Sequence, residues 1–179
     1  LCSLLPMMLL LAQGHDWFAA RGLRPGEKMM VVARLRADAP PALLATARLE
    51  VSGPLRVASP PVRAAAWREV AWNVERTGAD GTDGGRLLLR LGGQEFGMPA
   101  ATGPGLARRP ACRTASWREQ WLFPGETPLP RNQPLARIAL RRPAAEYNLL
   151  GWRTSWLWGL MAVSLLTGLL LKRPLGVEF

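Results

Sequence analysis

The sequence is poor in the side chains from which catalytic and metal sites are usually built. Its 179 residues contain one His, His15, and two Cys, Cys2 and Cys112. Two distant Cys and a single His cannot supply the ligands of a closed zinc site. His15 stands beside Asp16, and a lone His next to an Asp is far more often a solvated residue than a catalytic base. The sequence therefore predicts no catalytic residue, no metal site, no cofactor and no enzyme activity.

Lysine is also scarce, and Arg supplies nearly all of the formal net charge of +10. A composition high in Arg, Ala, Pro and Gly with little Lys, Asn or Ile indicates a GC-rich bacterial genome. The glycines of GADGTDGG at 78–85 have no phosphate-loop spacing and precede a predicted strand instead of a helix. They predict a flexible turn.

The longest feature that is present is an apolar run near the C-terminus. From Trp156 to Leu171 no residue is charged, and with 152–155 the run reaches the length that a helix needs to cross a bilayer. We therefore predict a transmembrane helix at 152–171 and a cytoplasmic tail at 172–179, because Lys and Arg favour the cytoplasmic end. The predicted membrane-interface residues are Trp17, Trp152, Arg153, Trp156, Trp158, Lys172 and Arg173.

Residues 1–13 form a second, shorter apolar segment. Two interpretations fit it: part of a transmembrane helix, or the hydrophobic core of a signal peptide. Either one places the residues between about 20 and 147 in a periplasm-like space, with the protein in a bacterial inner membrane. Cys2 would then lie in the membrane run and Cys112 in the exported segment, so we expect no disulfide between them.

The exported segment alternates apolar and polar residues as half-buried strands do, at 28–36, 44–51 and 68–75. A tight hairpin is predicted where Gly92-Gly93 separates RLLLRL from QEFGM. We expect 20–98 to form an immunoglobulin-like antiparallel β-sandwich. Its predicted core residues are Val31, Leu49, Val70, Trp72, Val74, Leu89 and Leu91.

After the sandwich, 99–147 is predicted to be an extended segment rich in Pro, Arg and Trp that ends in a last strand at 135–142. Its Trp117, Trp121, Leu122 and Phe123 need burial, either on the sandwich itself or on a partner protein or the bilayer surface. Its cations are expected to contact anionic lipid headgroups or the acidic face of a neighbouring subunit. The alternative is that they form a merely solvated surface. A periplasmic location argues against nucleic acid as a partner. The candidate contact residues are Arg108, Arg109, Arg113, Trp117, Arg118, Trp121, Phe123, Arg141 and Arg142.

Small residues recur at a helical spacing in the apolar run. Ser155 and Gly159 are four residues apart, as are Ser164 and Gly168. Each pair predicts a shallow helix face that a helix of another integral membrane subunit can approach closely. The alternative is that the helix is only an anchor, since Gly and Ser are frequent in membrane helices anyway.

Three unusual strings occur in order along the chain: LRPGEKMMVVARL at 23–35, WLFPGETPLP at 121–130 and GWRTSWLWGLMAVSLLTGLLLKRPLGVEF from Gly151. With them the chain resembles the C-terminal portion of an uncharacterised family of bacterial inner-membrane proteins. That family is similar in membrane plan to the YidC-like insertase superfamily. The resemblance implies an external domain followed by a last transmembrane helix.

Two classes of function follow from these observations. The first is a non-catalytic, membrane-anchored accessory or scaffolding subunit of a larger respiratory, photosynthetic or secretory complex. The second, implied by the resemblance, is an insertase-like or chaperone component for membrane-protein biogenesis. We favour the first, because the residues present make an anchor and a domain of a kind that binds partners.

Overall fold

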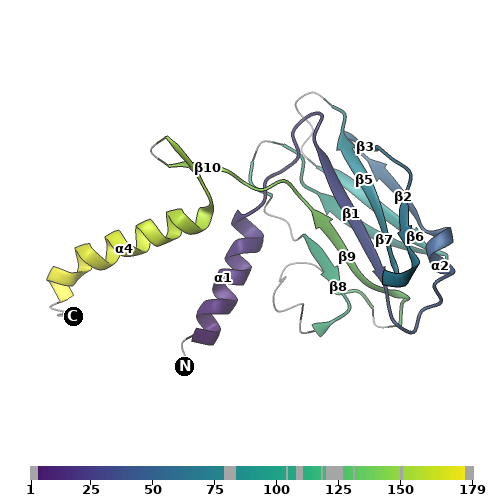
Figure 1. Ribbon diagram of the computed structural model, residues 1–179, viewed down its shortest axis with the longest axis horizontal. Helices are drawn as coiled ribbons and strands as arrows, with labels where there is room; N and C mark the ends of the chain where they lie inside the picture. The colour runs from purple at the N-terminus through teal and green to yellow at the C-terminus, as the bar shows by residue number, and fades with distance from the viewer. Residues whose placement is uncertain are drawn as a thin grey trace.

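The alternating segments of the sequence form strands in the computed structural model, which describes residues 4–78, 84–103, 105–107, 111–117, 119, 127–130, 132–149 and 151–175. These residues form two packed antiparallel sheets, with two helices and a hairpin beside them (Figure 1). The prediction of a mainly β protein with an antiparallel sandwich is confirmed.

The larger sheet has the order β3-β5-β1-β9-β8, and β4 also pairs with β5. Its strands are β1 (Lys28–Leu35), β3 (Leu55–Val57), β4 (Val62–Ala64), β5 (Glu69–Arg76), β8 (Cys112–Thr114) and β9 (Leu135–Arg141). A short 3-10 helix, η1 (Ala65–Trp67), joins β4 to β5. Alternate residues of β1 and β5 are buried, and Val31 lies opposite Trp72 in the register of the two strands.

The smaller sheet has the order β2-β6-β7, with strands β2 (Arg48–Ser52), β6 (Gly85–Leu91) and β7 (Gln94–Ala100). The predicted hairpin is confirmed: β6 and β7 pair from Gly85 with Ala100 to Leu91 with Gln94. Gly92 and Gly93 both have positive φ, +57° and +78°, as a tight hairpin turn requires.

The strand predicted at 44–51 starts later than expected. The short helix α2 (Leu43–Thr46) occupies its first residues. Pro40 and Pro41 fix their φ near the helical value, and their carbonyls accept the N–H groups of Leu43 and Leu44 at 3.2 and 3.0 Å. The prolines therefore start a helical turn before the chain can extend into β2.

The predicted core is where the two sheets face each other. Val31, Val70, Trp72, Val74, Leu89 and Leu91 are each at most 3% exposed, while Leu49 is only partly buried and packs against this cluster. The sandwich extends past the predicted boundary at residue 98, because β9 lies between β1 and β8 inside the larger sheet. The last predicted strand is thus an integral part of the sandwich, with Leu135, Ile138 and Leu140 buried in its core.

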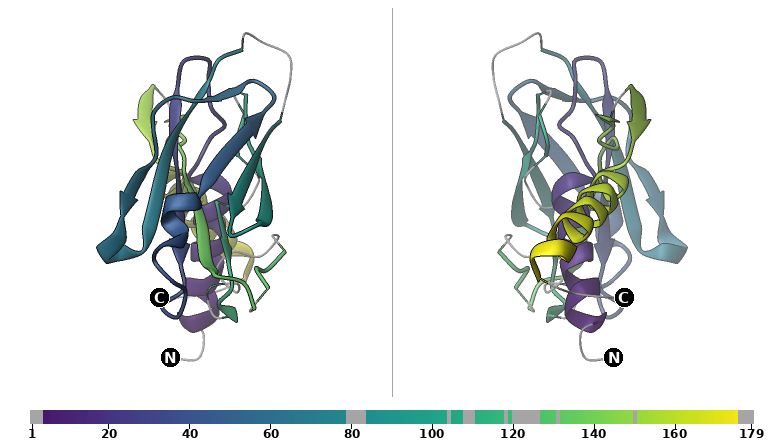
Figure 2. Two further views of the ribbon diagram at one scale, coloured as in Figure 1. Left: turned by 90° about the vertical axis from the view of Figure 1, so that its right-hand side faces the viewer. Right: turned by 90° about the vertical axis from the view of Figure 1, so that its left-hand side faces the viewer.

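Two helices and a hairpin complete the described chain: α1 (Leu4–Phe18), β10 (Tyr147–Leu149), β11 (Trp152–Thr154) and α4 (Trp156–Leu175). Figures 1 and 2 show α1 and α4 leaving the same side of the sandwich. Among the described residues, no helix combines the length and the apolar character needed to cross a membrane. The predicted span at 152–171 is therefore not confirmed and stays a prediction.

The start of the C-terminal helix differs from the prediction. Residues 152–154 are extended and pair with Tyr147–Leu149, so the helix begins at Trp156 and continues to Leu175. Gly151, at φ +88°, makes the turn of this hairpin. The pairing of 152–154 with Tyr147–Leu149 holds these residues extended, which is why they do not form the first turn of the helix.

Candidate functional site

The end of α1 and the start of α4 meet at one side chain, Trp156. Its indole ring lies 6.1 Å from the His15 ring and 6.0 Å from the Phe18 ring, measured between centroids. Its Nε1–H donates to His15 Nδ1 at 3.4 Å. A Cβ added to Gly14 would lie 3.3 Å from this indole, so the absence of a side chain at Gly14 lets the ring approach α1 closely.

The β10–β11 hairpin is fastened to the same place. The Tyr147 hydroxyl donates to the Phe18 carbonyl at 2.7 Å, and the Ala145 N–H donates to the Ala19 carbonyl at 2.7 Å. Burial raises the pKa of Tyr147 above its usual value, so the hydroxyl keeps the proton that it donates. We call this meeting of α1, the hairpin and α4 the junction.

An apolar groove of about 410 Å3 opens at the junction. Its lining includes Phe18, Tyr147, Trp156, Gly159, Leu160 and Val163. A Cβ added at Gly159 would meet no heavy atom within 4 Å. This turn of α4 therefore faces open space instead of another part of the described chain.

A second, basic pocket of about 240 Å3 lies next to the groove. Arg21, Arg24, Glu146, Tyr147, Asn148 and Arg153 line it. The ion pair between Arg153 and Glu146 is loose, at 3.6 Å, and both side chains are largely exposed. Such an exposed pair is worth little and leaves both groups able to accept other partners.

Arg21 is held much more firmly than Arg153. Its guanidinium donates two hydrogen bonds of 2.6 Å to the carboxylate of Glu27, which also accepts the Arg24 backbone N–H at 2.9 Å. The side-chain hydrogen bonds from Arg21 lower the pKa of Glu27 to about 2, and the Arg24 N–H adds to the shift. The RPGE string builds this arrangement, because Pro25 and Gly26, at φ +79°, form a turn closed by the Glu27 N–H on the Arg24 carbonyl at 3.0 Å.

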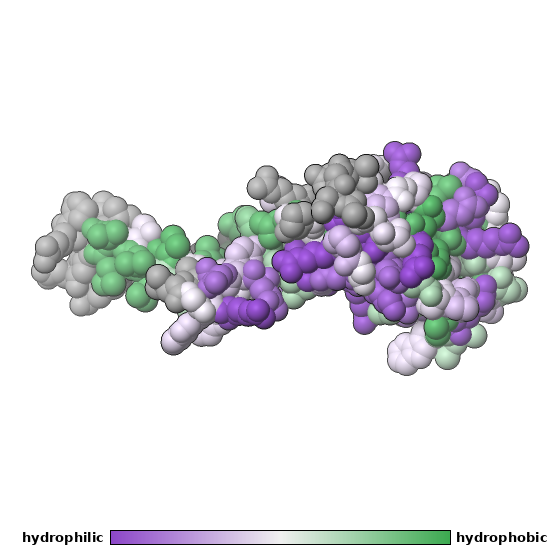
Figure 3. Space-filling model, turned by 90° about the horizontal axis from the view of Figure 1, so that it is seen from above, coloured by the Kyte–Doolittle hydropathy of each residue, from purple (hydrophilic) through white to green (hydrophobic). Residues whose placement is uncertain are grey.

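The helices beyond the junction carry large apolar side chains on their surface. On α1 the exposed ones are Met7, Met8, Leu10, Trp17 and Phe18. On α4 they are Leu157, Trp158, Leu160, Met161, Val163, Leu165, Leu166, Leu169 and Leu170. Figure 3 shows this apolar surface along the part of the molecule that projects from the sandwich. Soluble monomers rarely expose a continuous apolar surface of this kind.

The predicted interface residues fall into three groups. Trp17, Trp152, Arg153 and Trp158 are exposed beside or beyond the junction, whereas Trp156 is turned inward against α1. Lys172 and Arg173 belong to the last turns of α4, where the side chains lie outside the described part.

The helix-packing residues are split between the junction and the free part of α4. Ser155 precedes α4, and its carbonyl accepts the Trp158 N–H at 3.2 Å. Gly159 lines the apolar groove. Ser164 is exposed on α4, and Gly168 also lies in this helix.

The predicted contact residues of the Arg- and Trp-rich segment are only partly available to a partner. Arg113 donates to the carbonyls of Thr127 and Gly97, at 3.0 and 2.6 Å, so it ties a loop to the sandwich. Arg142 donates to the Ala107 carbonyl at 3.2 Å, while Arg141 and Trp117 are exposed. The remaining candidates, which lie outside the described residues, are Arg108, Arg109, Arg118, Trp121 and Phe123, and Leu122 lies there too.

Sequence reasoning missed Arg21, Arg24, Glu27 and Asn148 as site residues. The RPGE string and the only Tyr of the chain were visible signals, but they are more than 100 positions apart in the printed sequence. The bridge between Ala20 and Ala144 brings them together. Only that pairing makes one pocket from the two segments.

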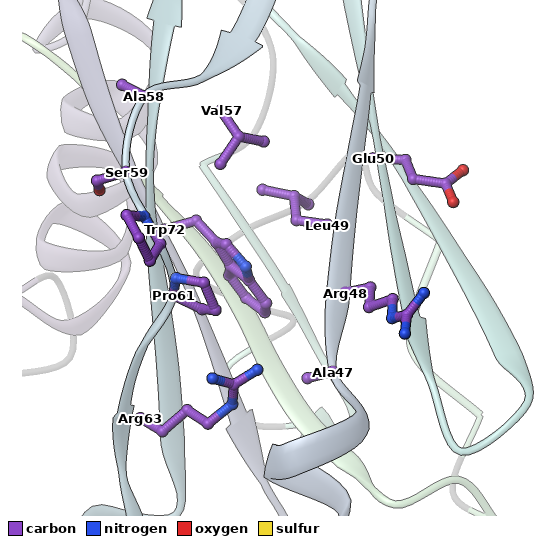
Figure 4. Close-up of a pocket in the computed structure, with 11 residues that line it drawn as sticks. Ala47, Arg48, Leu49, Glu50, Val57, Ala58, Ser59, Pro61, Arg63 and Trp72 are labelled. Atoms are coloured by element: carbon purple, nitrogen blue, oxygen red, sulfur yellow. The ribbon is translucent and has the colours of Figure 1, made fainter.

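A further groove, of about 540 Å3, lies between the edges of the two sheets (Figure 4). Trp72, Leu49, Val57 and Pro61 line it, and Arg63 at one end donates to the Leu44 carbonyl at 2.7 Å. Of the two arginines that line it, Arg48 and Arg63, the second is thus already bonded to the backbone. Within the described ranges, no three His, Cys, Asp or Glu side chains are grouped so that they could hold a metal ion.

No protein-family model, curated protein or solved structure matches this chain.

Proposed function

We propose that this chain is a non-catalytic accessory or scaffolding subunit that attaches to a bacterial inner membrane through α1 and α4. Its immunoglobulin-like sandwich would stand at the bilayer surface and dock, together with the helices, on a larger inner-membrane complex. The observation that carries this proposal is the contrast in burial: the sandwich buries most of its large apolar side chains, with Val57, Val62, Trp67 and Trp117 as exceptions, and the two helices expose most of theirs.

The energetics of α4 support attachment to lipid or to an apolar partner. Leu165, Leu169 and Leu170 are each between 62% and 73% exposed. Removing a side chain of this size from water contributes about 1.5–3 kcal/mol, so several of them together outweigh the cost of holding the helix at a membrane. Exposed Trp17, Trp152 and Trp158 suit the headgroup region, where an indole ring finds both apolar and polar neighbours.

The proposal includes the predicted orientation, with residues 20–147 in the periplasm and 172–179 in the cytoplasm. Partners would be other integral membrane subunits, which meet α4 on the side of Ser164 and Gly168, and anionic headgroups near the exposed Arg141. Labelling from outside intact cells tests the orientation. After Cys2→Ser, a reporter at Arg86→Cys should react while buried Cys112 should not, and a reporter added after Phe179 should react only once the membrane is opened. The opposite pattern would invert the topology.

Purification from gently solubilised membranes tests the function itself. The tagged full chain should sediment with membranes and then co-purify with one stoichiometric set of integral membrane proteins. Ser164→Leu should release that set while leaving the chain in the membrane fraction, because a bulky side chain keeps a partner helix away. Ala162→Leu adds the same bulk on the opposite side of α4 and should have little effect.

Two outcomes would overturn the accessory-subunit proposal. Recovery of the chain in the soluble fraction would remove membrane attachment. Co-purification of a mixture of nascent or unassembled membrane proteins would replace the accessory role with the insertase-like or chaperone role that the resemblance implies.

A further inference from the structure

We propose that the junction binds one molecule of an anionic phospholipid, with its phosphate in the basic pocket and an acyl chain in the apolar groove. This inference rests on the proposed attachment to a membrane and adds a specific site to it. The chemical class follows from the shape and charge of two cavities that no single segment of the chain contains.

The basic pocket and the apolar groove lie side by side, as the headgroup and the acyl chains of a phospholipid do. Tyr147 and Asn148 line both the basic pocket and the apolar groove. On one side of these residues are Arg21, Arg24 and Arg153, and on the other are Trp156, Leu160 and Val163. A ligand that fills both must be anionic at one end and apolar at the other.

The charges of the basic pocket suit one phosphodiester. Arg21, Arg24 and Arg153 carry three positive charges, and Glu27 and Glu146 carry two negative ones, which leaves one net positive charge. Arg21 is already neutralised by Glu27 through two short hydrogen bonds. Arg24 is exposed, and Arg153 is held only by its loose pair with Glu146, so these two guanidinium groups are the ones available to a phosphate.

The apolar groove is open where an acyl chain would lie. Gly159 has no neighbouring heavy atom within 4 Å of the position of an added Cβ, so the floor of the groove at this turn is unfilled. The Trp156 indole is hydrogen-bonded to His15 of α1, and the Tyr147 hydroxyl is hydrogen-bonded to the Phe18 carbonyl, so these two walls of the groove are already in place in the protein alone. Exposed Trp152 stands beside Arg153 on the hairpin, at the level where headgroup and hydrocarbon would meet.

Native mass spectrometry of the full chain in detergent micelles, titrated with phosphatidylglycerol, tests the site. We expect one retained phosphatidylglycerol, and weaker retention of phosphatidylcholine, which has no net charge. Arg24→Ala and Arg153→Ala should each weaken phosphatidylglycerol binding about fivefold, the effect of one cation near a phosphate. Arg48→Ala removes an exposed Arg from β2, away from the junction, and should change nothing.

A second pair of variants tests the apolar half. Gly159→Leu should fill the groove and weaken phosphatidylglycerol binding at least as strongly as either Arg variant, without a clash in the protein. Thr167→Leu places the same side chain at an exposed position of α4 outside the groove and should bind lipid as the wild type does. Glycerol phosphate, which has no acyl chain, should not be retained.

Three results would each overturn the inference. The first is equal binding of phosphatidylglycerol by the wild type and the Arg24→Ala/Arg153→Ala double variant. The others are retention of phosphatidylcholine equal to that of phosphatidylglycerol, and unchanged phosphatidylglycerol binding after Gly159→Leu. Retention of glycerol phosphate would identify a free-phosphate site instead. None of these would remove the proposed function, because a double variant that stays in the membrane fraction would still be attached through its helices. Conversely, a soluble chain would refute the attachment before any lipid was added.

Discussion

The sandwich buries most of its large apolar side chains, whereas the two helices leave most of theirs exposed to solvent. Trp72 in the sandwich is 3% exposed, whereas Trp158 on α4 is 64% exposed and Trp152 on the hairpin is 82% exposed. Each sheet hides its apolar face against the other, but the apolar surface of α4 has no such cover within the described chain beyond its contact with α1. The sandwich therefore draws its stability from its own core, and the helices depend on surroundings that the chain does not supply.

Residues 21–27, which we call the link, lie between these two regions and are held firmly to the sandwich. Buried Arg76 donates to the Leu23 carbonyl at 2.8 Å, and Leu23 itself is 1% exposed. The Gly22 N–H donates to the Gly105 carbonyl at 2.9 Å. The ion pair between Arg21 and Glu27 also lies in this segment. The orientation of the junction relative to the sandwich is therefore set by the link.

Removing a large side chain from the core of the sandwich should reduce its stability more than any other change considered below. Trp72→Ala should lower the free energy of unfolding by about 3–5 kcal/mol, because it leaves a large cavity between the sheets. Chemical denaturation of the full chain in mild detergent measures this. Trp67→Ala removes an exposed indole and should cost less than about 0.5 kcal/mol. A loss below about 1 kcal/mol at Trp72 would show that it does not anchor the core.

A methyl group at the link should have the next largest effect. A Cβ at Gly22 would lie 2.6 Å from the Gly103 carbonyl oxygen, so backbone must move to admit it. We expect Gly22→Ala to destabilise the sandwich by about 1–3 kcal/mol in the same assay. Gly97→Ala is the matched control, since a Cβ there meets nothing within 4 Å and Gly97 has no positive φ. Equal stability of the two variants would contradict the close packing at Gly22.

Acidification tests the link through Glu27, although it also protonates exposed carboxylates such as Asp38, whose pKa is lowered by its hydrogen bond from Arg36. The pKa of Glu27 is lowered from 4.5 to about 2 in the folded chain, so its contribution to stability is present above pH 4.5 and is lost as the pH falls toward 2. Glu27→Gln should cost about 1–2 kcal/mol at pH 7 and remove this part of the acid dependence. Glu50→Gln changes an exposed ion pair with Arg90 and should leave the acid profile unchanged. Denaturation between pH 2 and 7 measures both, and identical profiles for wild type and Glu27→Gln would refute the assignment.

The smallest effect on stability is expected in α4. Leu165→Ser and Leu169→Ser alter exposed side chains and should change the stability of the sandwich by less than about 0.5 kcal/mol. The same variants should lower the share of the chain in the membrane fraction, because they remove apolar area that we assign to the bilayer. A large loss of sandwich stability would show that α4 packs on it and would remove the contrast between the two regions.

The local structure of this protein follows from the order of residue types along the chain. Alternation at 28–36 and 68–75 predicts β1 and β5 with Val31 and Trp72 inward, because side chains on a strand must alternate between core and solvent. Gly92-Gly93 predicts the hairpin of β6 and β7, since glycine adopts the two successive positive φ values of such a turn at little cost.

Which distant segments meet cannot be predicted from any local pattern. Nothing local to 135–141 says that β9 lies between β1 and β8, because that place depends on satisfying the backbone groups along the second edge of β1. The start of α4 at Trp156 depends likewise on the pairing of 152–154 with Tyr147–Leu149. The basic pocket and the apolar groove exist because the bridge between Ala20 and Ala144 brings together segments that are far apart in the sequence. Contacts between such distant segments are fixed only when the whole fold closes.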